Sequence, residues 1–246
     1  MKKLITTTVF IFIAFFNATS QEQVYKDFGP LVNNPAIRNY NTKFDANMFE
    51  KRTDNNSIVK NYSDIEGTPY IFETFMLGEI LNDNQQLMMR YNAVTDEVEI
   101  QKTENNNVTL LKDNQFNTIL MNFGKYKLRL LNYRNYKSEG VYGYLVELFN
   151  SDTFTLLRKD KIILVGEKVA KTTFETSYPP KFVKAKNEYY LEKKDKTIVL
   201  VPKNKKELEA LFPDQKDKIA VFFKNKNYSF KEEQDLIEIT KFLTTF

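Results

Sequence analysis

Cysteine, histidine and tryptophan are all absent from this 246-residue chain. Because there is no cysteine, neither a disulfide framework nor a cysteine-linked lipid anchor can form. Because histidine is also missing, the chain lacks the Ser-His-Asp and Cys-His nucleophiles and the usual ligands of a zinc site. Any chemistry would depend on carboxylate, lysine, tyrosine or hydroxyl side chains, and any metal on oxygen ligands. We therefore expect a non-enzymatic protein with no catalytic residues, no metal site and no cofactor.

Glycine is scarce, with only seven residues in the chain. Gly140 and Gly143 are too sparse to form a phosphate-binding loop, and they predict a turn followed by a kink in a strand. An aspartate-rich calcium loop is also missing, since Asn82-Asp83-Asn84 is typical of a turn. The sequence thus offers no recognised anion or cation motif.

The main apolar run, Leu4 to Phe16, has 13 residues, fewer than the roughly 20 that span a bilayer. Met1-Lys2-Lys3 precedes it, and small residues at Ala18 and Ser20 follow. This order is typical of a cleaved secretory signal, so we expect residues 1–20 to be removed near Ser20-Gln21. The alternative, an uncleaved membrane anchor, is weakened by the shortness of the run and by its three threonines. We expect an exported product, periplasmic or extracellular, with no transmembrane segment.

A large excess of positive charge is missing from the expected mature chain. The full sequence has 36 Lys and Arg against 32 Asp and Glu, and loss of Lys2 and Lys3 leaves 34 against 32. Nucleic-acid binders usually carry a strong basic excess, because phosphate contacts dominate their affinity. We therefore expect no nucleic-acid partner.

Hydrophobic residues are plentiful enough for a real core, at 42% of the chain with 21 Phe and 14 Tyr. Residues 21–66 are polar and aperiodic, and we expect an irregular N-terminal segment there. Residues 67–246 predict a single α+β domain, β-rich over 67–201 and helical over 202–246.

The β-rich part predicts an antiparallel meander of roughly 8–11 strands, forming a curved sheet or half-barrel. The clearest hairpin joins Gln86–Tyr91 to Glu97–Lys102 through a turn at 92–96. The other expected strands are spaced about 8–12 residues apart, between turn residues. They are Tyr70–Leu77, Val108–Lys112, Phe116–Asn122, Tyr126–Tyr133, Val141–Phe149, Phe154–Arg158, Ile162–Glu167, Phe182–Ala185, Glu188–Lys193 and Thr197–Val201.

From Pro202 onward the apolar period becomes helical, and about three short amphipathic helices are expected to cap the sheet. Asn204 and Glu207 predict a capping box for the first helix, and Pro213 restarts the second. Ser229 and Glu232 predict a second capping box, which opens the last helix.

Five residues are weak candidates for a ligand or partner site. Glu97 and Glu99 lie on one strand face, about 7 Å apart, and could act as an acid/base pair. Arg90 on the facing strand favours ordinary cross-strand charge pairing instead. Tyr189 and Tyr190 lie among several lysines and could stack on a sugar, although a solvated strand edge explains the same pattern. These lysines are Lys181, Lys184, Lys186, Lys193, Lys194 and Lys196.

Three segments carry a resemblance to a known group of proteins: Gly67-Thr68-Pro69-Tyr70, Leu87-Met88-Met89-Arg90-Tyr91-Asn92 and residues 205–213. Together they resemble a widespread group of exported, uncharacterised β-rich proteins of Gram-negative bacteria, over roughly residues 65–243. The resemblance implies export and a β-rich fold. It implies no activity, and no site residue carries over.

The favoured function is a non-enzymatic accessory or binding protein of the cell envelope or periplasm. Its expected partner is an envelope protein, a lipid or a glycan. A first alternative is a carrier of an apolar ligand, lipid or lipoprotein, which needs an apolar cavity of about 300 Å³ or more between sheet and helices. A second alternative is a carboxylate-dependent hydrolase, which needs two carboxylates converging in a cleft.

Overall fold

The computed structural model describes residues 62, 65–81, 85–103, 106–172 and 174–246. The expected signal peptide at 1–20 and nearly all of the polar segment 21–66 lie outside these residues, as does the turn at Asn82-Asp83-Asn84.

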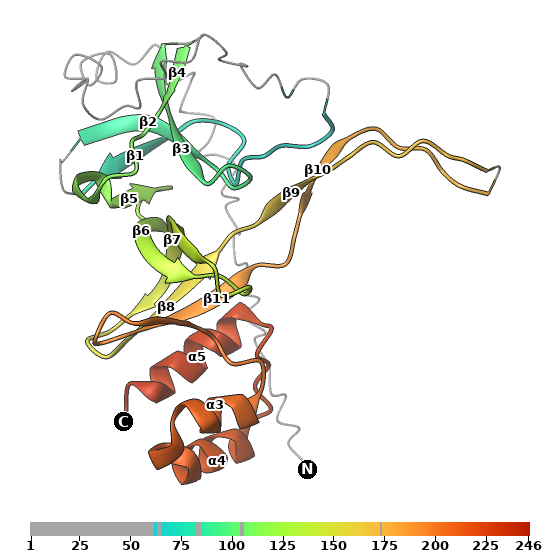
Figure 1. The fold of residues 1–246 in the computed structure, drawn as a ribbon. Helices are drawn as coiled ribbons and strands as arrows, with labels where there is room; N and C mark the ends of the chain where they lie inside the picture. The colour runs from blue at the N-terminus through green and yellow to red at the C-terminus, as the bar shows by residue number, and fades with distance from the viewer. Residues whose placement is uncertain (1–61, 63–64, 82–84, 104–105, 173) are drawn as a thin grey trace, which may run out of the picture. The chain divides into compact units, whose positions relative to one another are not determined.

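Within the described residues, ten strands form one antiparallel sheet in the order β12-β11-β8-β7-β6-β5-β1-β2-β3-β4 (Figure 1). Two more strands, β9 and β10, pair only with each other. The strands are β1 Met76–Ile80, β2 Gln85–Asn92, β3 Glu97–Thr103, β4 Asn106–Thr109, β5 Thr118–Met121, β6 Tyr126–Arg134, β7 Gly140–Asn150, β8 Phe154–Lys159, β9 Ile162–Val165, β10 Lys181–Lys184, β11 Glu188–Lys193 and β12 Ile198–Leu200. The predicted antiparallel meander is confirmed.

Three α-helices follow the last strand in this part of the chain, so the predicted α+β class is confirmed. They are α3 Lys205–Leu211, α4 Lys216–Asn225 and α5 Glu233–Leu243, and two 3₁₀ turns lie at η3 Asn114–Phe116 and η4 Pro213–Gln215. The first capping box forms as predicted, because the Asn204 side chain accepts the Glu207 N–H at 3.0 Å. The side chain of Glu207 in turn accepts the N–H of Lys203.

Two local predictions are wrong. Tyr70–Leu77 is not a strand, since only Tyr70 forms a bridge, to Asn92, and the chain bends until β1 begins at Met76. The Tyr70 ring is buried, so apolar residues here mark a packed loop as readily as a strand. The capping box at Ser229 does not form either, because the Ser229 N–H donates to Asp235 and α5 begins only at Glu233.

The first core cluster lies on one face of the sheet, under strands β1, β2, β3, β5, β6 and β7. Its largest fully buried side chains include Tyr91 on β2 and Tyr144 on β7, whose ring centroids are 6.1 Å apart. Three strands separate β2 from β7 in the sheet order. A direct ring contact across that interval requires the sheet to curl around this core.

A second core cluster lies on the opposite face, because strand residues alternate between faces. Leu128 and Leu130 of β6 enter the first cluster, whereas Leu131 and Tyr133 of the same strand enter the second. Strands β7, β8, β11 and β12 complete this second cluster, and β12 comes into contact with β6. The sheet therefore curls in opposite senses on its two faces, with β6 and β7 shared by both curls.

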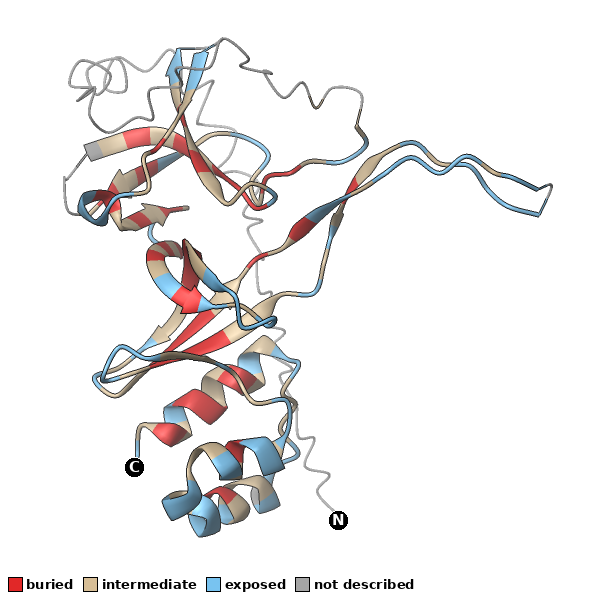
Figure 2. Ribbon diagram, viewed as in Figure 1, coloured by how far each residue is buried: buried red, intermediate tan, exposed pale blue. Residues whose placement is uncertain are grey.

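The helices pack on the outer face of the second curl (Figure 2). Leu236 and Ile239 of α5 are buried against Leu156 of β8 and Leu191 of β11. At the start of α5, Glu233 forms an ion pair with Arg158 of β8, with 2.6 Å between the charged atoms. Arg158 is itself held by the buried carboxylate of Asp160, at 2.5 Å. The apolar face of α5 and the ion pair of Glu233 with Arg158 thus hold this helix on the sheet.

Candidate functional site

Arg90, Glu97 and Glu99 lie on the β2–β3 hairpin, as predicted, and Arg90 is directly opposite Glu99. Arg90 donates to Glu99 at 2.8 Å, and its guanidinium lies 3.6 Å from the ring centroid of Tyr70. The Tyr70 hydroxyl also donates to Glu99 at 3.0 Å, and burial together with that carboxylate raises the pKa of Tyr70. Glu99 is therefore held by two structural partners, which favours cross-strand pairing over an acid/base role.

Tyr190 points into the second core cluster and is fully buried. Its ring packs against Tyr133 at 4.9 Å, and its hydroxyl donates to Glu188 at 2.7 Å. Tyr189, on the other face, is half-buried and lies 3.4 Å from Glu233 through its hydroxyl. The two tyrosines consequently do not form a shared stacking surface.

Tyr189 does line a cavity of about 390 Å³ together with lysines and other aromatic side chains. Its walls also include Tyr136, Phe230 and three lysines, Lys161, Lys186 and Lys203. The Lys161 ammonium forms an ion pair with Glu188 at 2.6 Å, and it lies 5.0 Å from the Tyr136 ring centroid. The sequence thus indicated the residue types around Tyr189, and strand alternation turns the neighbouring Tyr190 into the core.

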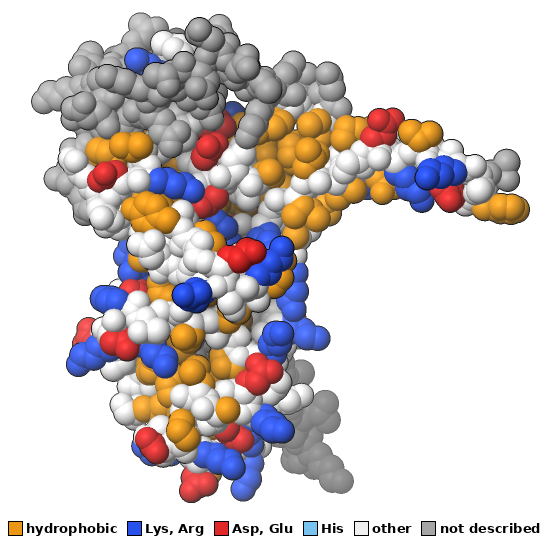
Figure 3. Space-filling view, viewed as in Figure 1, with side chains coloured by type: hydrophobic (Ala, Val, Ile, Leu, Met, Phe, Trp, Pro, Cys, Tyr) orange, Lys and Arg blue, Asp and Glu red, His pale blue; other side chains and the backbone are white. Residues whose placement is uncertain are grey.

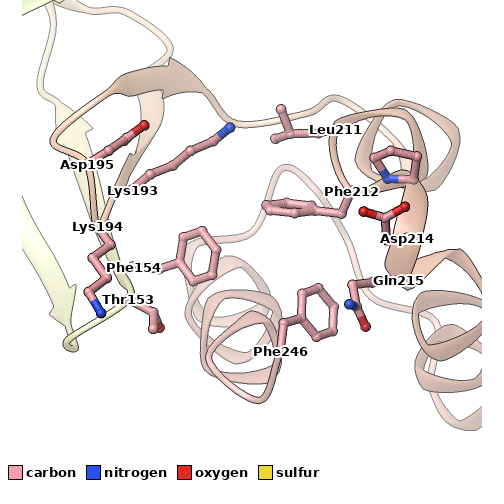
Figure 4. A pocket seen from close by; sticks show the side chains of 11 residues that line it. Thr153, Phe154, Lys193, Lys194, Asp195, Leu211, Phe212, Asp214, Gln215 and Phe246 are labelled. Atoms are coloured by element: carbon pink, nitrogen blue, oxygen red, sulfur yellow. The ribbon is translucent and has the colours of Figure 1, made fainter.

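A larger cavity of about 520 Å³ opens between the β8–β11 end of the sheet and the helices. Phe154, Phe212 and Phe246 line it, and Figure 4 shows their rings gathered around one space. The Phe212 ring contacts both other rings edge-on, at 5.6 and 5.8 Å between centroids. The polar side chains of Lys193, Lys194, Asp195, Asp214 and Gln215 also line the cavity. Such a cavity suits an apolar or aromatic group with a polar end.

A partly buried ion pair that the sequence did not reveal joins the β2–β3 turn to β7 and β8. Asp96 accepts from Lys159, from Lys112 at 2.8 Å and from the Tyr144 N–H at 3.2 Å. Gly143 makes room for it, because a Cβ there would clash with the Asp96 carboxylate. Burial lowers the pKa of Lys159, although Asp96 opposes that effect. Every ammonium proton of Lys159 has an acceptor, so we interpret this cluster as a structural closure of the first curl.

The most unusual surface is the arm, which we define as residues 161–186, with β9, β10 and the loop between them. It extends from the main sheet as a two-stranded ribbon, and Figure 3 shows apolar and lysine side chains along it. An isolated bridge between Lys168 and Tyr178 continues the β9–β10 register towards the tip. Its base is anchored by Ile162 and Phe182, both buried in the first core cluster.

The arm carries four of the ten large apolar side chains that are exposed in the described part of the chain. The exposed residues are Ile163, Leu164, Val169 and Phe174. Phe174 at the tip is 99% exposed. Residues 161–186 also contain six lysines and two glutamates, a net charge of +4 that equals that of the whole chain. The remaining residues are therefore neutral in sum. Counting charge by segment would have revealed this imbalance from the sequence.

In the described ranges, no group of three or more acidic, histidine or cysteine residues is arranged to hold a metal ion. No helix in that part of the chain has both the length and the apolar character to cross a bilayer. No protein family, curated protein or solved structure matches the chain.

Proposed function

We propose that this chain is an exported, non-enzymatic accessory or binding protein of the bacterial cell envelope, and that the arm is its binding element. The observation that carries the proposal is the concentration of the net charge of the chain, together with exposed apolar side chains, on one projecting ribbon. Exposed apolar surface bordered by polar residues is typical of an interaction site.

Two further observations support a binding role. Glu99, one of the two carboxylates that could have served a hydrolase, is engaged by Arg90 and Tyr70. The order of charged, apolar and small residues at positions 1–20 supports export. A product that leaves the cytoplasm and presents a basic, apolar arm is suited to contact an envelope component.

Site-specific photo-crosslinking in a bacterial host tests this proposal. A photoreactive residue is placed at Phe174 and, as a matched control, at Phe123, which is 83% exposed in the turn after β5. We expect the product to lie outside the cytoplasm without residues 1–20, and to cross-link a distinct envelope component from position 174 alone. A product retained in the cytoplasm, or identical adducts from both positions, would contradict the proposal.

The aromatic cavity favours a second candidate, the carrier of an apolar ligand. The face beneath α5 is filled by Leu236 and Ile239, so the ligand would lie at the edge of the helices, against Phe154, Phe212 and Phe246. Mass spectrometry of the purified chain tests this. A co-purifying apolar ligand that is lost in Phe154→Asp would support a carrier, and a chain purified without ligand would argue against one.

A further inference from the structure

We infer that the partner of the arm is an anionic lipid surface, into which the tip residue Phe174 inserts while the lysines bind the headgroups. This inference rests on the proposed function, and it specifies the chemistry of the partner. It starts from the composition of the arm, where six lysines and two glutamates accompany four exposed apolar side chains.

Charge complementarity indicates a negatively charged partner. A second copy of the chain would fit poorly, because two arms brought together would each contribute a net charge of +4 and would repel each other. Without residues 1–20, the remainder of the chain carries a net charge of only −2, a small acidic excess beside the +4 of the arm of another copy. A lipid surface with anionic headgroups supplies this charge, and each lysine near such a surface strengthens binding about fivefold.

The distribution of apolar side chains favours a lipid phase over the surface of an acidic protein. The two most exposed apolar side chains of the arm, Val169 and Phe174, lie towards its end, whereas Ile163 and Leu164 lie on β9 nearer its base. Apolar groups at the end of a projecting element can enter a bilayer interface, which surrounds the inserted element on all sides.

The geometry of the tip fits shallow insertion. Phe174 and Val169 are the most exposed apolar side chains of the arm, and Lys171 lies between them in sequence. From Val165 to Thr172 the arm spans about 23 Å at the rise of a strand. Interfacial apolar groups enter only about 5–10 Å into the boundary of headgroups and acyl chains. The tip can therefore be immersed while the main sheet remains outside the bilayer.

Vesicle co-sedimentation tests the inference with the chain from Gln21 onward, the expected mature form. Vesicles of phosphatidylglycerol and phosphatidylcholine are compared with vesicles of phosphatidylcholine alone. We expect binding to the anionic vesicles that weakens as salt is added, because screening shortens the reach of the lysine charges. No binding to anionic vesicles, or equal binding to both kinds, would overturn the inference.

Two variants with matched controls assign the binding to the arm. Phe174→Ser should weaken binding on the order of tenfold through lost apolar burial, whereas Phe123→Ser should leave it unchanged. The double variant K168Q/K171Q should weaken binding roughly 25-fold, whereas K206Q/K224Q, which removes two exposed lysines from α3 and α4, should have far less effect. Equal effects of the arm and control variants would place the contact elsewhere and contradict the inference.

The outcomes separate this inference from the proposed function. Absence of vesicle binding, combined with a cross-link from position 174 to an envelope protein, would overturn the lipid inference and retain the binding role. Absence of both vesicle binding and an arm-specific cross-link would overturn the two together.

Discussion

The main sheet and the arm contain similar apolar residues, but they differ in how far these residues are buried. Leu157 of β8 is fully buried between the layers of the second core cluster, whereas Leu164 of β9 is 49% exposed. The main sheet buries both of its faces by curling and by packing against α5. A two-stranded ribbon has no further layer, and it is marginally stable on its own. The difference indicates that folding energy is concentrated in the main sheet, while the arm is held in place mainly by the buried residues at its base.

The two regions also differ in how they hold their charges. Arg129 of β6 pairs at 2.5 Å with Glu192 of β11, whose side chain is only 3% exposed. Burial alone would raise the pKa of Glu192, but the hydrogen bonds and charge of Arg129 hold it below its ordinary value. On the arm, Lys168 and Glu175 are 3.7 Å apart, and both side chains are exposed. Only the first pair fixes strands that are distant in the sheet order.

The largest expected difference comes from truncating one leucine in each region. Leu157→Ala should lower the free energy of unfolding by about 3 kcal/mol, because a buried leucine loses its contacts and leaves a cavity. Leu164→Ala should lower it by at most about 1 kcal/mol, because this side chain is already half in water. Urea denaturation measures both. Equal losses would show that the arm contributes to the stable core.

Breaking one ion pair in each region should give the next largest difference in stability between the main sheet and the arm. Arg129→Ala should cost about 3 kcal/mol, because it leaves the carboxylate of Glu192 buried without its main partner. Lys168→Gln should change stability by less than about 0.5 kcal/mol, since exposed pairs contribute little. Thermal unfolding monitored by circular dichroism compares the two variants. A small effect of Arg129→Ala would contradict the closure of the second curl by this pair.

Alkaline pH should destabilise the main sheet through its buried tyrosines. Burial, reinforced by neighbouring carboxylates, raises the pKa of Tyr91, Tyr126 and Tyr190 above the ordinary value of 10.0. Above pH 10 the unfolded chain loses these protons while the folded chain keeps them, so stability should fall by about 1.4 kcal/mol per pH unit for each tyrosine.

Lys159 changes stability with pH in the opposite direction to the tyrosines. Burial lowers its pKa, so it loses its proton more easily in the folded chain than in the unfolded chain. Its contribution rises with pH only up to the ordinary value of 10.5, so the tyrosines dominate above that. Urea denaturation between pH 9 and 12, with phenolate absorbance recorded in parallel, measures the effect. Unchanged stability between pH 10 and 12 would contradict the burial of these hydroxyl groups.

Shortening the arm should have only a small effect on stability. Replacing residues 168–178 by Asn-Gly removes the tip but keeps the bonds that join Glu66 to Pro180 and Phe182. The two-residue turn matches the twist of the flanking strands. We expect the free energy of unfolding to change by less than about 1 kcal/mol while binding through the arm is lost. Unfolding of the variant at much lower denaturant would show that the arm is part of the folding unit.

Much of the fold was predictable because strand and helix periods are local properties of the chain. The β2–β3 hairpin, the strand β6 and the helix capped by Asn204 lie close to where the alternation and the capping residues placed them. Where a local prediction failed, another contact had replaced the one that the sequence pattern suggested. Ser229 had the right spacing for a cap, but its N–H is taken by Asp235, and α5 begins later.

The candidate sites were less predictable, because they depend on pairings between distant segments. The cross-strand pair of Arg90 and Glu99 could be foreseen, since the turn fixes the hairpin register. The contact of Asp96 with Lys159 and Lys112 could not, because it joins a turn to two segments brought close only when the sheet curls. The aromatic cavity likewise gathers Phe154, Phe212 and Phe246 from separate elements.

The sequence by itself determined the composition limits, the α+β class and the position of most elements, because these follow from residue types and short-range periodicity. Tertiary structure decided which apolar runs became core and which became the exposed arm. Ile162 and Phe182 are buried in the first cluster, whereas Ile163 and Leu164 beside them remain exposed. The physical reason is that burial depends on whether a further layer of structure covers a strand, and no local pattern specifies that layer.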